Sequence, residues 1–352
     1  MKSLRNPLGL NSLLLGAVIV AGLLGTLPTP SDANHVHMQG GPFIGVVLSV
    51  AVDRVDPETL YCAAYGGGVF RSRDRGASWV AINRGLPDRQ VFSLLLDPNN
   101  PSQLYVGTDQ GIFHSTNKGD SWRLLSPVLK SRNIRAIAIN LEDPKPLYAA
   151  TDQGVFQGKD GNWENVSKGL RSKDVRALVV SPQRMIYAGT FDGIFKKERR
   201  EPSWASANNG LTDKKVRALV MDPGSPNVLY AGTASGGVFK TTNGGKRWRA
   251  MNHGLLNTTV LSLAMTHTQP STLYAGTVGG VYISRHGEDH WVPRAGDLPF
   301  TVSTLAFDPV EPSLVYAGSG GRLFKSTNKG EKWKEIARQV NHFGPGPISA
   351  RH

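Results

Sequence analysis

The sequence predicts an all-β chain folded as seven similar sheets, because one pattern recurs through most of its 352 residues. Its seven tryptophans are spaced 41 to 44 residues apart. They are Trp79, Trp122, Trp163, Trp204, Trp248, Trp291 and Trp333. Seven tyrosines keep the same period, each after an aliphatic residue, as at Tyr61 and Tyr230. Such a period, filled by short apolar runs and Gly, Asn or Asp turns, is typical of blades. We therefore expect a seven-bladed β-propeller of four-stranded antiparallel blades.

The fifth repeat shows the expected order of elements within a blade. A first strand over 216–221 is almost continuously apolar, as in a strand covered on both faces by neighbouring sheets. The next turn, over 222–227, contains two prolines, which cannot continue the hydrogen-bonded ladder. A second strand over 228–233 and a third over 237–240 follow, and the fourth begins after the tryptophan. Because each blade is contiguous in sequence, ring closure is expected to rely on packing between the two end blades.

The N-terminus has the composition of an export signal. Lys2 and Arg5 precede an apolar run over 13–27, and a small-residue site ends at Ala33. This order predicts a secretory signal peptide over 1–33 that is cleaved, and hence a periplasmic or secreted protein. The alternative is an uncleaved anchor, since an apolar run of about 15 residues can hold a thinned membrane.

The remaining boundaries follow from the repeat. The propeller is expected to occupy residues 43–340, between an N-terminal linker over 34–42 and a flexible C-terminal tail over 341–352. Cys62 is the only cysteine and takes the place of a repeat alanine, so we expect a buried, unreactive thiol. Neither a metal site nor a cofactor is expected, because the chain has no HExxH sequence, nucleotide-binding loop or haem attachment sequence.

A second motif, Ser/Thr-x-Asp/Asn-x-Gly-x-x-Trp, occupies the turn before the fourth strand in four repeats. Its acid or amide positions are Asp74, Asn117, Asn243 and Asn328, and its tryptophans are Trp79, Trp122, Trp248 and Trp333. The Asp or Asn oxygen is suited to accept backbone N–H bonds within the turn, Gly to take a positive φ, and Trp to pack between sheets. Asn in three of these copies favours a structural acceptor over a catalytic or calcium-binding charge.

Three repeats depart from this motif. The turn over 158–163 is short, the segment 198–204 has lost the motif, and His286 replaces the acid before Trp291. Because each of these repeats keeps its tryptophan, we expect their sheets to form with altered turns. The chain resembles the BNR/Asp-box seven-bladed β-propellers over essentially its whole mature length.

Alternating strand directions place the turns on two opposite faces of the disc. We call the face with the second-to-third-strand turns and the inter-blade connections the top, and the face with the first turns and the Asp boxes the bottom. All nine glutamates map away from the top, whereas a glycosidase needs two acids across one bond. Only aspartates remain: Asp109, Asp152 and Asp192 lie in equivalent turns and can form a carboxylate cluster, although a hairpin role also explains them.

Positive charge gathers on the top where the chain enters blades three, four and five. Arg135, Arg176 and Arg217 share one register position at the start of the innermost strands. The accompanying bases are Arg132, Arg171, Lys173, Lys214 and Lys215. Such an arc is suited to a carboxylate, a sulfate or an acidic peptide, and the alternative is a solvated basic rim. Without residues 1–33 the chain keeps 38 basic and 26 acidic residues, which favours an anionic partner. Nucleic acid is not expected, because aromatic residues do not interleave with the bases.

The export signal, seven blades and arginine-rich top resemble the photosystem II assembly and stability factor type of propeller. The resemblance implies a non-catalytic scaffold that binds a membrane-protein complex under assembly, with Arg135, Arg176 and Arg217 as the contact patch. The leading hypothesis is thus an exported propeller that binds an acidic protein or peptide. The alternative is a carbohydrate-active propeller: a diverged glycoside hydrolase, related to sialidases and xyloglucanases by the repeat, or a glycan-binding lectin.

Overall fold

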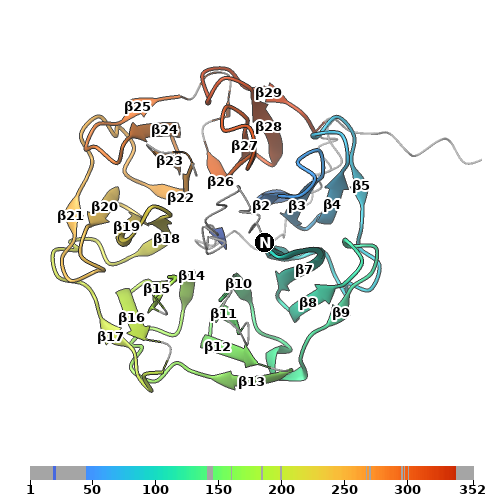
Figure 1. Ribbon diagram of the computed structural model, residues 1–352, viewed down its shortest axis with the longest axis horizontal. Coiled ribbons are helices and arrows are strands. Elements are labelled where there is room, and N and C mark those ends of the chain that lie inside the picture. Colours follow the sequence, from blue (N-terminus) through green and yellow to red (C-terminus); the bar gives the residue numbers. More distant parts are fainter. Residues whose placement is uncertain are drawn as a thin grey trace, which may run out of the picture.

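The computed structural model describes residues 45–337, apart from short gaps, and the backbone of one N-terminal strand. The gaps are 141–145, 160, 184, 199, 267, 269–270, 295, 297 and 300. The side chains of the predicted signal peptide, the linker and the C-terminal tail lie outside the described residues. Seven antiparallel sheets surround a central channel, which confirms the predicted seven-bladed β-propeller (Figure 1). Within the described part of the chain, no helix has the length and apolar character needed to cross a membrane.

Each blade takes four consecutive strands. Blade one has β2 (Val46–Val52), β3 (Leu60–Tyr65), β4 (Gly68–Ser72) and β5 (Val80–Ala81). Blade two has β6 (Val91–Asp97), β7 (Asn100–Thr108), β8 (Gly111–Ser115) and β9 (Arg123–Leu124). Blade three has β10 (Ile134–Ile139), β11 (Leu147–Thr151), β12 (Gly154–Lys159) and β13 (Asn162–Asn165). Blade four has β14 (Val175–Val180), β15 (Met185–Thr190), β16 (Gly193–Glu198) and β17 (Ala205–Ser206).

The last three blades follow the same plan. Blade five has β18 (Val216–Asp222), β19 (Ser225–Thr233), β20 (Val238–Thr241) and β21 (Arg249–Ala250). Blade six has β22 (Val260–Met265), β23 (Thr272–Thr277), β24 (Gly280–Arg285) and β25 (Val292–Pro293). Blade seven has β26 (Val302–Phe307), β27 (Val315–Ser319), β28 (Arg322–Ser326) and β29 (Lys334–Glu335). A 3₁₀ turn, η1 (Pro127–Leu129), precedes blade three, and the backbone of β1 (Ile19–Val20) pairs with β14.

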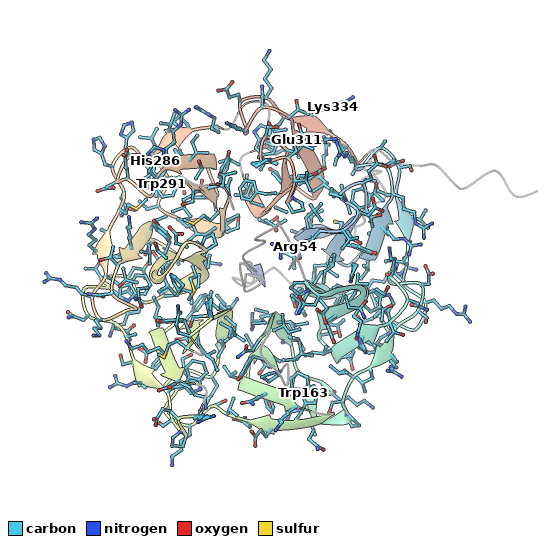
Figure 2. All side chains as sticks on the ribbon, viewed as in Figure 1. Arg54, Trp163, His286, Trp291, Glu311 and Lys334 are labelled. Carbon is cyan, nitrogen blue, oxygen red and sulfur yellow. The ribbon has the colours of Figure 1, made fainter. Side chains whose placement is uncertain are left out.

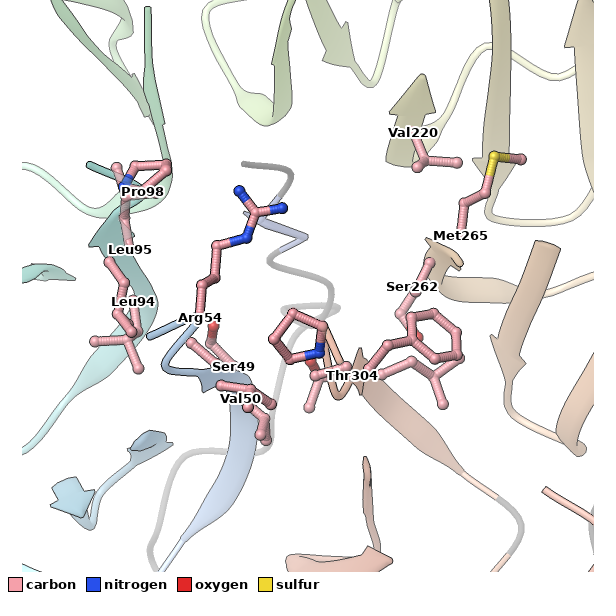
Figure 3. Close-up of a pocket in the computed structure, with 18 of the residues that line it drawn as sticks. Ser49, Val50, Arg54, Leu94, Leu95, Pro98, Val220, Ser262, Met265 and Thr304 are labelled. Carbon is pink, nitrogen blue, oxygen red and sulfur yellow. The ribbon is translucent and has the colours of Figure 1, made fainter. Parts of the chain in front are cut away.

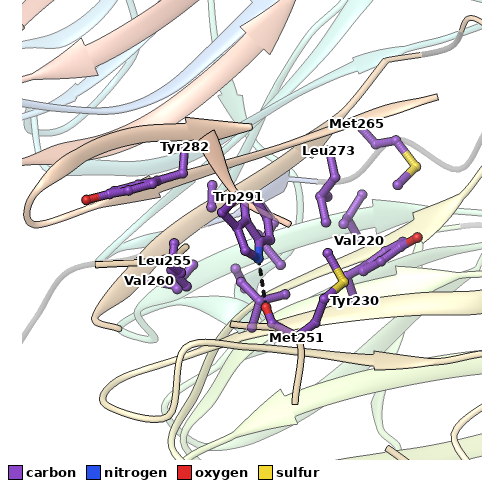
Figure 4. Close-up of a cluster of buried hydrophobic side chains, with 13 residues drawn as sticks. Val220, Tyr230, Met251, Leu255, Val260, Met265, Leu273, Tyr282 and Trp291 are labelled. Atoms are coloured by element: carbon purple, nitrogen blue, oxygen red, sulfur yellow. Dashed lines mark hydrogen bonds between the residues drawn. The ribbon is translucent and has the colours of Figure 1, made fainter. Parts of the chain in front are cut away.

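Neighbouring blades are joined by apolar clusters and by the tryptophans. Between blades five and six, Tyr230, Met265 and Trp291 lie in one buried cluster (Figure 4). Trp291 Nε1 donates to the carbonyl oxygen of Met251 in the preceding repeat at 2.7 Å. Trp163 and Trp291 both stand well out from the channel in their blades (Figure 2). The tryptophan repeat thus provides an inter-blade contact, as the sequence predicted.

The ring closes by packing between blades one and seven, as expected. Val47 and Trp79 share a cluster with Tyr316 and Leu323. In addition, Ser303 Oγ donates to the Val47 carbonyl at 2.5 Å. Closure therefore takes place within the described residues of the two end blades.

Asp-box turns hold their own backbone in the predicted manner. Asp74 Oδ1 accepts from Ser78 N at 2.8 Å, and the equivalent amide Asn117 accepts from Ser121 N at 3.0 Å. Asn243 and Asn328 make the same bond. The structure adds that the residue before the motif Gly also takes a positive φ, for example Arg75 at 55°. All seven sheets form, including those of the three repeats that depart from the motif.

Every innermost strand contains a β-bulge near its top end. The register shifts between its first and third residues in blades two to seven and between its second and fourth in blade one. The bulged residues are Leu48, Phe92, Arg135, Arg176, Arg217, Leu261 and Ser303. A bulge leaves one residue outside the ladder and re-aims its side chain. The fold thus presents one side chain per blade at the top end of its innermost strand.

Candidate functional site

The three predicted arginines are the bulged residues of adjacent blades. Arg135, Arg176 and Arg217 lie on β10, β14 and β18 respectively. Arg176 is buried with 6% of its surface exposed, whereas Arg135 and Arg217 are half-buried. Blades one, two and six carry buried apolar residues at the same position. The cationic character of the top is therefore confined to one side of the ring of bulges.

An aspartate connects two of these arginines. Asp174 Oδ2 accepts from Nη2 of Arg176 at 2.7 Å and from its Nε at 3.2 Å. On its other side, Asp174 Oδ1 lies 3.2 Å from Nε of Arg135, an ion pair without hydrogen-bond alignment. One carboxylate thus fixes two guanidinium groups and neutralises part of their charge.

A phenylalanine connects the second and third arginines. The guanidinium carbon of Arg176 lies 4.4 Å from the centroid of the Phe191 ring, and that of Arg217 lies 5.6 Å from it. Phe191 comes from the turn between β15 and β16. Cations held against an aromatic ring keep their charge while losing conformational freedom. Arg135, Arg176, Arg217, Asp174 and Phe191 together form what we call the arginine arc.

The arc retains unused hydrogen-bonding capacity. Nε and Nη1 of Arg217 are buried and have no hydrogen-bond partner within the described residues. Burial lowers the pKa of Arg217, and the charge of Arg176 lowers it further. The pKa of Arg135 is lowered by the same two causes in the same order. Since a guanidinium stays protonated at neutral pH, the arc is a set of partly dehydrated cations suited to an anionic ligand.

The five accompanying bases contribute unequally. Arg132 donates hydrogen bonds to the carbonyls of Val128 and Lys130 in its own loop. Its guanidinium carbon lies 4.9 Å from the centroid of the Phe156 ring. Lys173 Nζ donates to the Ser167 carbonyl at 2.9 Å. By contrast, three bases are exposed and their side chains make no hydrogen bond or ion pair within the described part of the chain: Arg171, Lys214 and Lys215. The structure therefore separates bases held by the protein from bases open to a partner.

The top-face aspartates do not occupy matching positions. Asp192 N donates to Thr190 Oγ1, as Gln110 N does to Thr108 Oγ1, so Asp192 corresponds to a glutamine of the other turns. The residue of blade four that corresponds to Asp109 and Asp152 is Phe191. The expected cluster of three matched carboxylates is therefore wrong in register.

Asp109 instead pairs with an acid that the sequence did not connect to it. Burial and, after it, the neighbouring Asp88 together raise the pKa of Asp109 to about 6. Asp88 comes from the connection between blades one and two. Asp152 bonds separately, accepting from Asn133 Nδ2 at 2.9 Å. The two acids thus make different contacts.

The repeat tyrosines are buried, and Cys62 is buried as the sequence predicted. Burial raises the pKa of Tyr61, Tyr230 and Tyr274 to about 12. Cys62 is fully buried, and burial raises its pKa too. A hydroxyl or thiol in such surroundings resists ionisation and is a poor nucleophile.

Sequence reasoning missed two members of the arc. Asp174 was not identified as a partner of the arginines, although among the three blades only blade four has an acid two residues before its arginine. Phe191 was not noted, although it stands where blades two and three have aspartate. Aligning the turns residue by residue would have shown both exceptions.

Comparison with known proteins identifies the fold and no family. No family model matches the chain, and no curated protein matches it. Among solved structures, an ancestral GH74 enzyme has a TM-score of 0.67 at 19% identity, covering 85% of this chain and 48% of that one. The extracellular domain of a B. thetaiotaomicron protein described as a hybrid two-component system has a TM-score of 0.67 at 17% identity, covering 82% and 39%. This chain thus spans about half or less of those two proteins.

A structure of YCF48 bound to a D1 peptide is similar over a comparable region. Its TM-score is 0.63 at 17% identity, and the match covers 82% of this chain and 95% of that one. YCF48 from Cyanidioschyzon merolae gives 0.63 at 16% identity, covering 81% and 96%. At identities this low, the structural similarity shows the fold alone. These proteins share the seven-bladed propeller with this chain.

Proposed function

We propose that this protein is an exported, non-catalytic scaffold that binds an acidic segment of another protein on the arginine arc. The observation that carries the proposal is the repetition of arginine at one bulge position in three adjacent blades. Neighbouring bulges lie beside one another on the ring, so the arc matches a ligand with several spaced carboxylates.

Local geometry indicates where such a ligand would bind most strongly. Asp174 already accepts hydrogen bonds from two nitrogens of Arg176, whereas Arg217 has two nitrogens without hydrogen-bond partners. Arg171, Lys214 and Lys215 lie exposed on the same connections and would attract a negatively charged segment. We therefore place the strongest carboxylate contact at Arg217 and weaker contacts along the rest of the arc.

The fold comparison supports a peptide ligand. YCF48, which binds a D1 peptide, matches this chain over nearly its own full length. Similar length and blade number make peptide binding on a propeller face a reasonable model for this protein. We extend the proposal to a membrane-protein complex under assembly as the source of the segment, following the resemblance of the export signal and the arginine-rich top.

The carbohydrate-active alternative has weaker support. Glycosidases of either stereochemistry hold their two carboxyl groups about 5 Å or more apart. Asp88 and Asp109 interact directly, since Asp88 raises the pKa of Asp109, whereas a glycosidase keeps its two carboxyl groups on opposite sides of the glycosidic bond. The buried repeat tyrosines offer no ionisable nucleophile either. These features favour binding over hydrolysis.

Fluorescence anisotropy with a glutamate-rich peptide tests the proposal. We expect Arg135→Gln/Arg176→Gln/Arg217→Gln to weaken binding by about 100-fold, since each lost charge-assisted contact is worth roughly 1.5–3 kcal/mol and the losses overlap. Raised salt should weaken the wild type more than the variant.

A matched control removes the same charge elsewhere. Arg73→Gln/Arg123→Gln/Arg247→Gln changes three exposed arginines away from the arc. It should reduce affinity by less than about threefold, through long-range attraction alone. Equal losses in the two triple variants would mean that net charge, not the arc, attracts the peptide. Turnover of a xyloglucan or sialoside would favour the carbohydrate alternative.

A further inference from the structure

The lower half of the central channel contains a cavity of about 220 Å³ that is separate from the arginine arc. Its walls come from the innermost strands of blades one, two, five, six and seven and from the turns that follow them. Figure 3 shows Leu94 and Pro98 on one side, with Val220 and Met265 across from them. Those strands run from the top to the bottom, and the lining residues come from their later parts and from the turns after them. The cavity therefore belongs to the bottom face.

Apolar side chains form most of the wall. Leu96, Met221, Met265 and Phe307 line it near the ends of their strands. For comparison, an apolar cavity of about 150 Å³ in an engineered protein stays dry and binds benzene. A cavity of this size and lining is therefore suited to a short hydrocarbon chain.

The bottom mouth is bordered by prolines, with one cation among them. In blades two, five and seven an Asp at or just after the end of the innermost strand is followed by Pro: Pro98, Pro223 and Pro309, all of which line the cavity. In blade one, Arg54 follows Asp53 at the corresponding place and also lines the cavity. Figure 3 shows the Arg54 side chain extending over the open space.

Two charged residues line the cavity, Asp97, whose Oδ1 accepts from Asn99 N, and Arg54, and they do not pair with each other. Within the described residues, the Arg54 guanidinium makes no hydrogen bond or ion pair. The neighbouring Asp53 is turned away, because its Oδ1 accepts from Val55 N at 2.9 Å and from Asp56 N at 3.2 Å. The surrounding protein lowers the pKa of Arg54 by desolvation. Arg54 is exposed and has no counterion, and an unpaired cation attracts an anionic ligand.

Large apolar side chains also stand exposed beside this mouth. Val55 is 74% exposed and lines the cavity, and Val310, which follows Pro309, is 70% exposed. Each is held out by an aspartate that accepts its backbone N–H, Asp53 for Val55 and Asp308 for Val310. The mouth therefore offers an apolar approach to the cavity.

One buried polar atom in the wall lacks a partner. Ser262 lines the cavity and is 1% exposed, yet its Oγ has no hydrogen bond within the described residues. Ser93, which occupies the same register in blade two, donates from its Oγ to the Ile134 carbonyl at 3.3 Å. An unpaired buried hydroxyl is costly, and a ligand or water in the cavity would satisfy it.

We propose that this cavity binds a medium-chain carboxylate, with the hydrocarbon chain between the innermost strands and the carboxylate on Arg54. Charge complementarity assigns the head group, because Arg54 is the cation at the mouth. The volume limits the length of the hydrocarbon chain. The cavity is larger than the engineered cavity that binds benzene and smaller than the roughly 300 Å³ at which drug-sized sites begin. This site is independent of peptide binding on the top face.

Isothermal titration of the full chain with octanoate tests the proposal. We expect saturable binding of octanoate, with acetate at least about 100-fold weaker because it lacks the buried chain. Octylammonium should also bind more weakly, because its charge repels Arg54. Arg54→Gln should weaken octanoate binding by about tenfold, the loss expected for one charge-assisted contact. Arg247→Gln, which changes an exposed arginine of a bottom-face Asp box, should leave binding unchanged.

Three results would overturn the proposal. Equal affinities for octanoate and acetate would show that the cavity takes no chain. Equal affinities in wild type and Arg54→Gln would show that Arg54 does not hold the carboxylate. Absence of octanoate binding both to the full chain and to a chain without residues 1–33, the predicted signal peptide, would show that the cavity takes no carboxylate. That truncation is informative because the ring closes within the described residues of blades one and seven.

Discussion

The two mouths of the channel are built by the same strands and differ in chemistry. At the top, a bulge leaves one residue per blade outside the ladder, and three adjacent blades place arginine there. At the bottom, the strands end in Asp-Pro turns, and aliphatic residues surround a single arginine, Arg54. Each blade supplies the same backbone position at each mouth, and the residue at that position determines which ligand can bind there.

The two mouths should also respond differently to conditions. Binding on the arc depends on several half-buried charges and should weaken as salt rises. Binding in the lower cavity depends mainly on apolar burial and should show a negative heat-capacity change.

Trp248→Ala should destabilise the scaffold that both mouths share. Trp248 is 2% exposed, and its Nε1 donates to the Ala207 carbonyl of the preceding repeat at 2.8 Å. Removing a buried tryptophan costs about 3–5 kcal/mol of unfolding free energy. Urea denaturation measures the loss, with Val80→Ala at a 62% exposed position as the control. A loss below about 1 kcal/mol would contradict the role of the tryptophans in joining the blades.

The two ligands should be separable by mutation. The triple arginine-to-glutamine variant of the arc should lose about 100-fold in peptide affinity and keep its octanoate affinity, whereas Arg54→Gln should do the reverse by about tenfold. Anisotropy and calorimetry on the same protein samples measure both. If either variant impaired both ligands equally, the two mouths would not be independent sites.

Asp109→Asn should reveal the carboxyl pair on the top face through pH. Burial and Asp88 raise the folded-state pKa of Asp109 to about 6, above the usual 3.8. The folded protein therefore binds this proton more tightly than the unfolded chain, and the group destabilises the fold as pH rises through 4 to 6. The variant should unfold at a temperature roughly 2 °C higher than wild type above pH 6, with the gap vanishing near pH 4. Calorimetry that finds a constant gap would contradict the pairing.

Asp74→Asn should have the smallest effect. Asp74 accepts from Ser72 Oγ and Ser78 N, and Asn117 makes the same two bonds in its own turn. The substitution should change the unfolding free energy by less than about 0.5 kcal/mol, whereas Asp74→Ala should cost about 1 kcal/mol. Chemical denaturation compares the two variants. A large loss with Asn would mean that the charge itself matters at this turn.

Most of the fold could be predicted because its signals repeat. Seven copies of the Trp and Tyr positions fixed the blade number, and the prolines after the innermost strands fixed the first turns. Closure by the end blades followed from the contiguous blades. These features depend on local sequence and on period, so a single sequence displays them many times.

The sites were less predictable because they depend on exceptions to the repeat. The shared register of Arg135, Arg176 and Arg217 was visible, but the bulge that aims them was not, since it is a backbone feature of every blade. The stacking of Phe191 and the pairing of Asp88 with Asp109 join residues from different turns. The lower cavity depends on how far five blades stand apart, which no motif encodes.

The most direct test of the central claim compares two arginines on the same face. Arg217 has two nitrogens without partners, whereas Arg132 is bonded to its own loop. Anisotropy with the acidic peptide should show a loss of about tenfold for Arg217→Gln and less than about twofold for Arg132→Gln. Equal losses, or a larger loss for Arg132→Gln, would contradict the assignment of the binding site to the arginine arc.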